Sequence, residues 1–271
     1  MSKRERGLVF ERGNMRVRDT RYGAMLFNNN DAYIGRSLEL YGEYSEAEAE
    51  IFRQMLSPGA VALDIGANIG AHTLSMAKFV GPEGMVYAFE PQRSVYYILC
   101  ANLALNEVVN VCALQIGLGR EVSKALAPRV NYATHGNFGG VSLAMAGSGD
   151  EVTVLTLDSM ALPRCNLIKI DVEGMEDDVI AGAENTIRRL RPFMYVENDR
   201  KEKSGALIRR ILDLNYRLYW HFPRIVTLKN FYDNQDPEIM PYISTNMLCV
   251  PRELPVSIKG REILSENDRP S

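Results

Sequence analysis

The residues best suited to bind a ligand lie in the segment ALDIGANIGAHT, where Asp64, Gly66, Asn68 and Gly70 separate an apolar run from a helical pattern. An open parallel sheet binds ligands at the carboxyl ends of its strands, and glycines there let a ligand approach the backbone. Glu90 ends the next apolar run, in VYAFEP. An acid at that place can accept hydrogen bonds from the hydroxyls of a ribose. This pattern predicts a nucleoside site.

The details of the turn favour one nucleoside over another. A dinucleotide site prefers G-x-G-x-x-G, because the backbone must approach a pyrophosphate at a helix N-terminus. Here Asn68 replaces the middle glycine, and the carboxylate of Asp64 would repel a pyrophosphate. S-adenosylmethionine carries an ammonium and a sulfonium instead, and a charge pair about 4 Å apart is worth roughly 4 kcal/mol at an effective dielectric near 20. We therefore expect S-adenosylmethionine, with Thr73 as a further contact, and keep an NAD-dependent dehydrogenase as the rival.

Two acids that could supply a general base follow a later strand. Asp171 and Glu173 are two residues apart, so strand alternation predicts that they share one face at the ligand crevice. Two close carboxylates raise one pKa, which could tune one of them as a base for an acceptor hydroxyl. Alternatively, Glu173 belongs with Glu176, Asp177 and Asp178 to a helix N-terminus, where negative charge is favoured.

A second polar group follows the next strand. Glu197, Asn198 and Asp199 are expected to form a substrate wall beside Asp171, with Asn137 of the NFGG segment as a further substrate contact. Hard oxygen ligands gathered at strand ends could instead chelate Mg²⁺. We do not favour a metal, and we expect that EDTA leaves activity intact.

A histidine between aromatic residues is the other candidate base. His221 follows Tyr219 and Trp220 in YWHFP, a combination suited to stacking on a sugar ring while an imidazole accepts a proton. A lone histidine is more often structural, so that alternative stays open. His72 and His135 receive no role.

Short apolar runs and helical patterns alternate along the chain and would position these residues. The expected strands are 61–65, 85–90, 111–116, 152–157, 167–171, 193–197, 217–220 and 247–250, and the expected helices are 73–80, 95–106, 176–190 and 204–214. This alternation predicts an α/β fold whose parallel sheet is buried on both faces. An earlier helix begins at Ser45, with Glu48 completing a capping box.

Three segments fall outside that rhythm. We expect an N-terminal extension over 1–44 with a β-hairpin at 7–28, one main domain over 45–255 and a polar, frayed tail over 256–271. The glycine-rich stretch 119–150 has no sustained period, and a loop of that length in a compact domain is usually functional.

Several motifs together resemble the FkbM family of S-adenosylmethionine-dependent methyltransferases. They are DIGANIG at 64–70, AFEP at 88–91, TLDSM at 156–160, IKIDVEGMEDDVIAGA at 168–183 and YVEND at 195–199. The resemblance runs from about residue 41 to residue 250. It implies a class I methyltransferase fold: a Rossmann-like sheet of seven mostly parallel strands with helices on both faces and the last strand antiparallel. It also implies O-methylation, commonly of sugars, glycans or natural products.

Composition limits the partners. The 31 Lys and Arg against 34 Asp and Glu leave no cationic field for nucleic acid. No apolar stretch approaches the roughly 20 residues of a membrane span, and the opening MSKRERG lacks a signal-peptide core. We therefore expect a cytoplasmic protein, with homo-oligomerisation left open.

The sequence thus predicts an S-adenosylmethionine-dependent O-methyltransferase that acts on a hydroxyl of a sugar, glycan or glycosylated natural product. The alternatives are an N- or carboxyl-methyltransferase of a small metabolite or peptide, and a non-catalytic interaction module that retains the fold.

Overall fold

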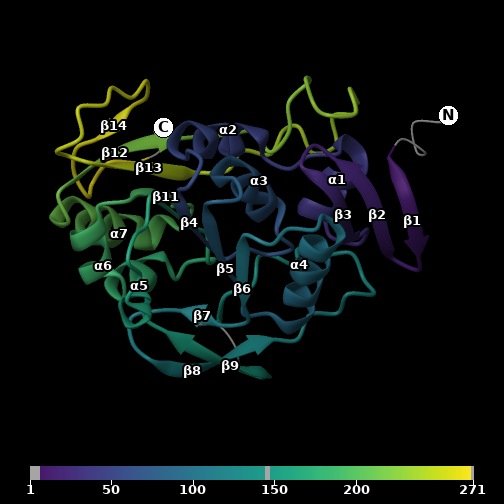
Figure 1. Cartoon of the computed structure of the whole chain (residues 1–271), viewed down its shortest axis with the longest axis horizontal. Helices are drawn as coiled ribbons and strands as arrows, with labels where there is room; N and C mark the ends of the chain where they lie inside the picture. The colour runs from purple at the N-terminus through teal and green to yellow at the C-terminus, as the bar shows by residue number, and fades with distance from the viewer. Residues whose placement is uncertain (1–6, 144–146, 270–271) are drawn as a thin grey trace.

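Eight strands form the central sheet of the computed structural model, which describes residues 7–143 and 147–269 (Figure 1). Their order is β14-β12-β13-β11-β10-β4-β5-β6. The bounds are β4 Val61–Ile65, β5 Met85–Phe89, β6 Val111–Leu114, β10 Leu167–Ile170, β11 Phe193–Glu197, β12 Tyr216–His221, β13 Asn246–Pro251 and β14 Glu262–Ile263. Strands β4 and β10 are buried at every residue, as their continuous apolar runs predict.

The sheet has the expected class I arrangement. Strands β6, β5, β4, β10 and β11 run parallel, and β13 pairs antiparallel with both β11 and β12. The α/β fold whose seventh strand, β13, is antiparallel is therefore confirmed. The short β14 adds an eighth strand, because it pairs with the outer edge of β12.

Helices cover both faces of the sheet. Helices α2 (Glu46–Met55), α3 (Ala71–Val80) and α4 (Arg93–Leu105) pack on one face, and α5 (Glu176–Ala181), α6 (Glu184–Leu190) and α7 (Lys201–Asp213) pack on the other. In the part of the chain that the structure describes, no helix combines the length and apolarity needed to cross a membrane.

The helix expected over 176–190 is broken into α5 and α6. The break lies at Gly182, whose carbonyl accepts a hydrogen bond from Asp158 N–H at 3.0 Å. A Cβ at Gly182 would lie 2.0 Å from Gly119 O, so only glycine lets the two backbones meet. The single-helix prediction was wrong because sequence periodicity does not register this close approach.

The capping box expected at Ser45 is also absent. Ser45 makes no side-chain capping bond and has a φ of 43°. The Glu48 side chain contacts His72 and Asn246 instead, which draws it away from the helix start.

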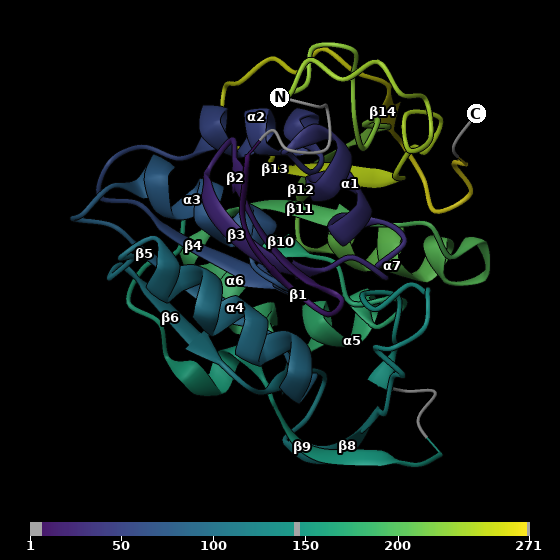
Figure 2. The same cartoon turned by 90° about the vertical axis from the view of Figure 1, so that its right-hand side faces the viewer.

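The N-terminal segment forms a three-stranded antiparallel sheet, one strand more than a hairpin, followed by α1 (Ile34–Tyr41) (Figure 2). Its strands are β1 Leu8–Arg12, β2 Met15–Thr20 and β3 Gly23–Asn28. Asn102 on α4 and Asn106 directly after it each donate to and accept from the backbone of β3, at Leu26 and Ala24. The extension is therefore fastened to the central layer.

Two segments expected to lack regular structure are ordered. Within 119–150, β8 (Ser123–Pro128) pairs antiparallel with β9 (Gly149–Leu155), and β9 pairs parallel with β7 (Gly117–Leu118). The part of the tail up to residue 269 is also packed, because Ile263 is buried in β14 and Asp268 accepts a hydrogen bond from Trp220 Nε1 at 3.2 Å. The frayed-tail expectation was wrong for these residues.

Candidate active site

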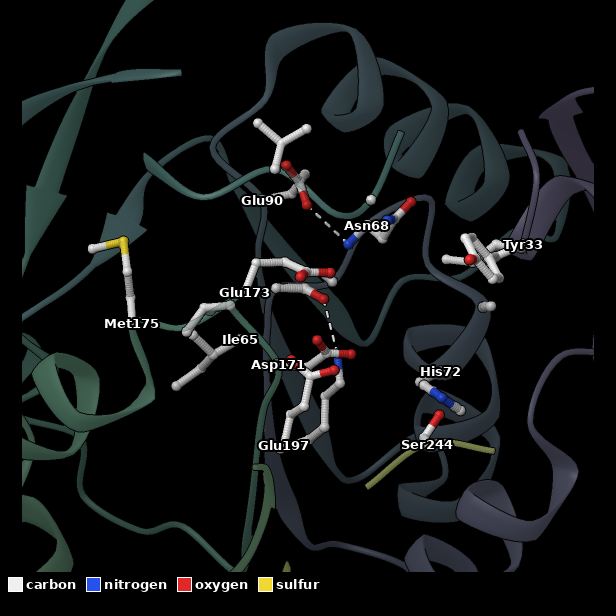
Figure 3. A pocket seen from close by; sticks show the side chains of 18 of the residues that line it. Tyr33, Ile65, Asn68, His72, Glu90, Asp171, Glu173, Met175, Glu197 and Ser244 are labelled. Atoms are coloured by element: carbon white, nitrogen blue, oxygen red, sulfur yellow. Dashed lines mark hydrogen bonds and ion pairs between the residues drawn. The ribbon is translucent and has the colours of Figure 1, made fainter. Parts of the chain in front are cut away.

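A cavity of about 380 Å³ opens at the carboxyl ends of β4, β5, β10 and β11 (Figure 3). Gly66, Glu90, Asp171 and Glu197 line it, one from the end of each strand. The strand-end position predicted from the sequence is thus where the cavity lies.

The turn after β4 is held in a conformation that its residue types permit. Gly66 has a φ of 79°, and a Cβ there would lie 1.8 Å from Asp171 O. Gly70 has a φ of 89°, and a Cβ there would come too close to the Leu99 side chain. Asn68 also adopts a left-handed φ, of 50°, and its side chain accepts a hydrogen bond from Ile69 N–H at 2.7 Å.

Glu90 is tied to this turn by its carboxylate. It accepts hydrogen bonds from Asn68 N–H at 3.0 Å and from Gln92 N–H at 2.8 Å. Burial raises the pKa of Glu90 to about 7. Each carboxylate oxygen has a further lone pair that a ligand hydroxyl could use.

Asp64 does not line the cavity. It is fully buried, where it accepts a hydrogen bond from Thr73 Oγ1 at 2.6 Å and lies 3.2 Å from Lys169 Nζ. Because Lys169 already neutralises it, the expected attraction between Asp64 and a cationic ligand does not hold. Thr73 is likewise fully buried and acts on the turn through Asp64.

Lys169 is a functional residue that the sequence reasoning missed. Its Nζ donates to Gly66 O at 2.8 Å and lies 3.5 Å from Asp171 Oδ2. Burial acts to lower the pKa of Lys169, but Asp64 and Asp171 outweigh it and raise that pKa. A lysine inside the apolar strand LIKI could have been recognised as the partner of a buried acid. The register of β10 on β4 sets Lys169 opposite Asp64.

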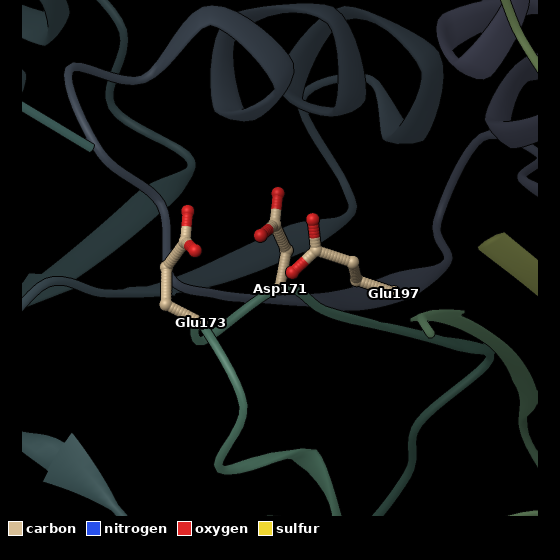
Figure 4. Close-up of side chains that lie close together, drawn as sticks. All are labelled: Asp171, Glu173 and Glu197. Carbon is tan, nitrogen blue, oxygen red and sulfur yellow. The ribbon is translucent and has the colours of Figure 1, made fainter. Parts of the chain in front are cut away.

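Three carboxylates converge on the cavity from β10 and β11. Asp171, Glu173 and Glu197 each offer an oxygen within 4.8 Å of the others (Figure 4). Burial, reinforced by Asp171, raises the pKa of Glu173 to about 7, although Arg200 donates a hydrogen bond to it. The same causes raise the pKa of Glu197 well above its ordinary value, and its Oε2 has no hydrogen-bond partner. Such a cluster could hold a cationic ligand or a divalent metal ion.

The expected substrate wall is brought together only in part. Asp199 lines the cavity, 3.3 Å from Arg200 Nη1. Asn137 also lines it, while its Oδ1 accepts hydrogen bonds from Gly139 and Gly140 N–H. Asn198 is buried away from the cavity, where its Nδ2 donates to Met247 Sδ.

The aromatic platform expected at YWHFP does not face the cavity. Tyr219 and Trp220 are 6% and 5% exposed, because each packs into a separate apolar cluster. His221 lies behind Tyr195, whose hydroxyl is 2.7 Å from His221 Nδ1, and burial lowers the pKa of His221. These three residues are not placed to touch a substrate in the cavity.

Other aromatic and apolar side chains line the cavity where the YWHFP residues were expected. They are Tyr33, Ile34, Tyr44, Ile225, Tyr242 and Ile243. The rings of Tyr33 and Tyr242 meet edge to face with centroids 5.3 Å apart. Glu48 and His72 line the cavity beside Tyr44. No periodicity in the sequence marks this set, because its members come from both ends of the chain.

Comparison with known families decides the relationship of the chain. The family described as "Methyltransferase FkbM domain" matches residues 64–218. The chain belongs to the FkbM methyltransferase family. The match includes the turn after β4, Glu90 and the acidic cluster. It ends before Ile225, Tyr242 and Ile243.

The named relatives are distant in sequence from this chain. Hexuronic acid methyltransferase AglP of Haloferax volcanii is 29% identical over 158 residues, which are 55% of this chain and 62% of AglP. Methyltransferase 1 of Beauveria bassiana is 33% identical over 145 residues, 45% of this chain and 58% of the relative. The 2-O-methyltransferase NoeI of Sinorhizobium fredii is 26% identical over 204 residues, 65% of this chain and 81% of NoeI. The chain thus spans less than two thirds of the first two relatives.

Among solved structures, methyltransferase FkbM from Methylobacillus flagellatus KT aligns with a TM-score of 0.48 and 16% identity. That alignment covers 74% of this chain and 50% of the other.

Proposed function

We propose that this FkbM family protein is an S-adenosylmethionine-dependent O-methyltransferase that acts on a hydroxyl of a sugar, glycan or glycosylated natural product. The main observation in support is that the Glu90 turn, the acidic cluster and an aromatic wall all line one cavity. We call the first two the donor end, comprising Gly66, Asn68, Glu90, Asp171, Glu173 and Glu197. We call the aromatic and apolar set the acceptor end, comprising Tyr33, Ile34, Tyr44, Ile225, Tyr242 and Ile243.

The charge of the cavity fits S-adenosylmethionine. Its lining includes six carboxyl-bearing residues, Glu48, Glu90, Asp171, Glu173, Glu197 and Asp199, and three basic ones, His72, Lys169 and Arg200. A ligand with an ammonium and a sulfonium relieves that acidic surplus, whereas the pyrophosphate of a dinucleotide adds to it. The buried Glu197 Oε2, which lacks a partner, supplies a free oxygen for such a cation.

Each donor-end residue has a role that its position supports. Glu90 would accept the ribose hydroxyls, since its backbone partners already hold the carboxylate in place. Asp171 and Glu197 would face the cationic end, and Lys169 orients Asp171. When bound, S-adenosylmethionine supplies a methyl group activated by positive sulfur. The main task of the chain is then to align the acceptor oxygen with that methyl group, which can contribute about 7 to 11 kcal/mol.

The acceptor end supports a sugar as the methyl acceptor. Edge-to-face tyrosines offer a flat apolar surface to a pyranose ring, and carboxylates such as Asp199 accept hydrogen bonds from its hydroxyls. Two relatives are named for a hexuronic acid and for a 2-O-position. The acidic surplus here favours a neutral sugar over a uronic acid, because an acceptor carboxylate would be repelled.

Methyl-labelled S-adenosylmethionine tests this proposal with a panel of p-nitrophenyl glycosides of neutral hexoses, 6-deoxyhexoses and a hexuronic acid. We expect label in an alkali-stable methyl ether of a neutral glycoside. An alkali-labile product would indicate a methyl ester and contradict O-methylation of a hydroxyl. Calorimetry with S-adenosylhomocysteine and NAD on the same protein should show binding of the former alone; NAD binding in the cavity would overturn the cofactor assignment.

A further inference from the structure

Glu48 and His72 line the acceptor side of the cavity without a part in the proposed binding of the donor. We propose that His72 takes the proton from the acceptor hydroxyl and that Glu48 positions its imidazole. This inference rests on the proposed function, and it names the proton acceptor that the function requires.

Glu48 is fixed by two partners from different elements. Its Oε2 lies 3.1 Å from His72 Nε2, and its Oε1 accepts a hydrogen bond from Asn246 Nδ2 at 3.1 Å. Asn246 also donates to the Tyr195 hydroxyl, again at 3.1 Å. Burial acts to raise the pKa of Glu48, but His72 and Lys169 together hold it below its ordinary value. A charged, immobile carboxylate therefore lies against one nitrogen of the imidazole.

The imidazole itself is held by aromatic rings. Tyr44 and Phe52 lie 5.6 and 5.3 Å from His72 between centroids, and Phe52 meets it edge to face. His72 is 6% exposed, so its ring has little freedom. Among the described residues, no group hydrogen-bonds to Nδ1 of His72. His72 Nε2 is buried and lies within ion-pair distance of Glu48 Oε2, without the geometry of a hydrogen bond, so Nδ1 is the nitrogen left for a ligand in the cavity.

The rival bases in the cavity are already engaged. Asp171 lies 3.5 Å from Lys169 Nζ, and Glu173 accepts a hydrogen bond from Arg200. Glu197 faces the cationic end of the donor in the proposed function, so that cation engages its carboxylate. A carboxylate that faces a cation is a weaker base than a neutral imidazole whose other nitrogen contacts a carboxylate.

The proposed step balances without an additional reactant. As the acceptor oxygen bonds to the methyl carbon, its proton passes to His72 Nδ1, and the electron pair of the breaking carbon–sulfur bond stays on sulfur. The imidazolium is then stabilised by Glu48 until it returns the proton to solvent. The same arrangement, in which a carboxylate orients an imidazole and stabilises its cation, operates in hydrolases.

The test compares His72→Gln with His135→Gln, which removes an exposed histidine that is not among the residues lining the cavity. With the labelled donor and the p-nitrophenyl glycosides, we expect His72→Gln to lower kcat by about 10²- to 10⁴-fold. His135→Gln should match the wild type. Affinity for S-adenosylhomocysteine, measured by calorimetry, should change by less than about threefold in either variant.

Two further variants separate chemistry from structure. Added imidazole should restore part of the turnover of His72→Ala, and Glu48→Gln should lower kcat less than His72→Gln does. Turnover of His72→Gln within about threefold of the wild type overturns the inference while the proposed function stands. So does a loss confined to S-adenosylhomocysteine affinity, since His72 would then hold the donor. If the wild type methylates no glycoside, the proposed function and this inference fall together.

Discussion

The donor end and the acceptor end of the cavity are built by different means. The donor end comes from strand ends and tight turns within residues 64–218, the range that the FkbM family matches. Its groups are fixed by neighbours in the sheet, as the pairing of Lys169 with Asp64 shows. Such a region has few alternative arrangements, because moving one residue disrupts the register of two strands.

The acceptor end depends on packing between distant segments. Residues around Tyr33 and residues around Tyr242 flank the family range and meet through a small core of Tyr41, Ile225, Val226 and Ile239. The Tyr41 hydroxyl ties them further, because it donates to Asp236 O at 2.7 Å and accepts from Ile239 N–H at 3.2 Å. We therefore propose that the donor end carries the methyl-transfer chemistry and that the acceptor end carries the substrate specificity of this chain.

The largest expected effect is the loss of stability when the Lys169–Asp64 ion pair beneath the donor end is broken. Replacing Lys169→Met should lower the free energy of unfolding by about 3 to 5 kcal/mol, because it leaves the buried Asp64 without its cation. Urea denaturation measures this, with Tyr242→Ala, a change at an exposed position, as the control from the acceptor end. A loss under about 1 kcal/mol would contradict the view that the ion pair supports the turn.

The next effect concerns donor affinity. Glu90→Gln should weaken S-adenosylhomocysteine binding about tenfold or more at pH 8, where the wild-type side chain is charged, since hydrogen bonds to charged groups contribute about 1.5 to 3 kcal/mol. The pKa of Glu90 is raised to about 7, so the difference should shrink as the pH falls below that value and the wild-type carboxyl becomes neutral. Calorimetry at pH 6 and pH 8 checks both parts. An equal deficit at the two values would show that the charge of Glu90 plays no part.

A smaller effect is expected at the acceptor end. Tyr242→Ala should raise the KM for a p-nitrophenyl glycoside about three- to tenfold, because it removes one ring of the tyrosine pair. Affinity for S-adenosylhomocysteine should stay at the wild-type value. Tyr219→Phe is the matched control, since Tyr219 is buried outside the cavity. If Tyr242→Ala weakens the donor instead, the division of the cavity into two ends is wrong.

No change is expected from metal removal. EDTA should leave turnover intact, because Lys169 and Arg200 already face two of the three clustered carboxylates and the cationic end of the proposed donor faces Glu197. Turnover with and without EDTA, followed by addition of Mg²⁺, measures this. Loss of activity that Mg²⁺ restores would assign the cluster formed by Asp171, Glu173 and Glu197 to a cation.

Much of the donor end could be predicted from local patterns. The apolar run that ends in Asp64, the glycines after it and the acid at Glu90 lie close together in the chain, and strand-end chemistry follows from that order. The alternation of strands and helices likewise indicated the sheet and its buried faces. The break at Gly182 was not predictable in this way, because its cause is the backbone at Gly119, far away in the sequence.

The sequence by itself determined the order of elements, the family and the turn that would receive a nucleoside, since each depends on residues within one strand–turn–helix unit. The tertiary structure alone decided which side chains reach the cavity. It paired Asp64 with Lys169 and buried Tyr219 and Trp220 in the core. It also brought Tyr33, Tyr242 and the Glu48–His72 pair to the wall of the cavity. The physical reason is that a side chain's partner is set by sheet register and by packing between distant segments, which residue type and local spacing do not encode.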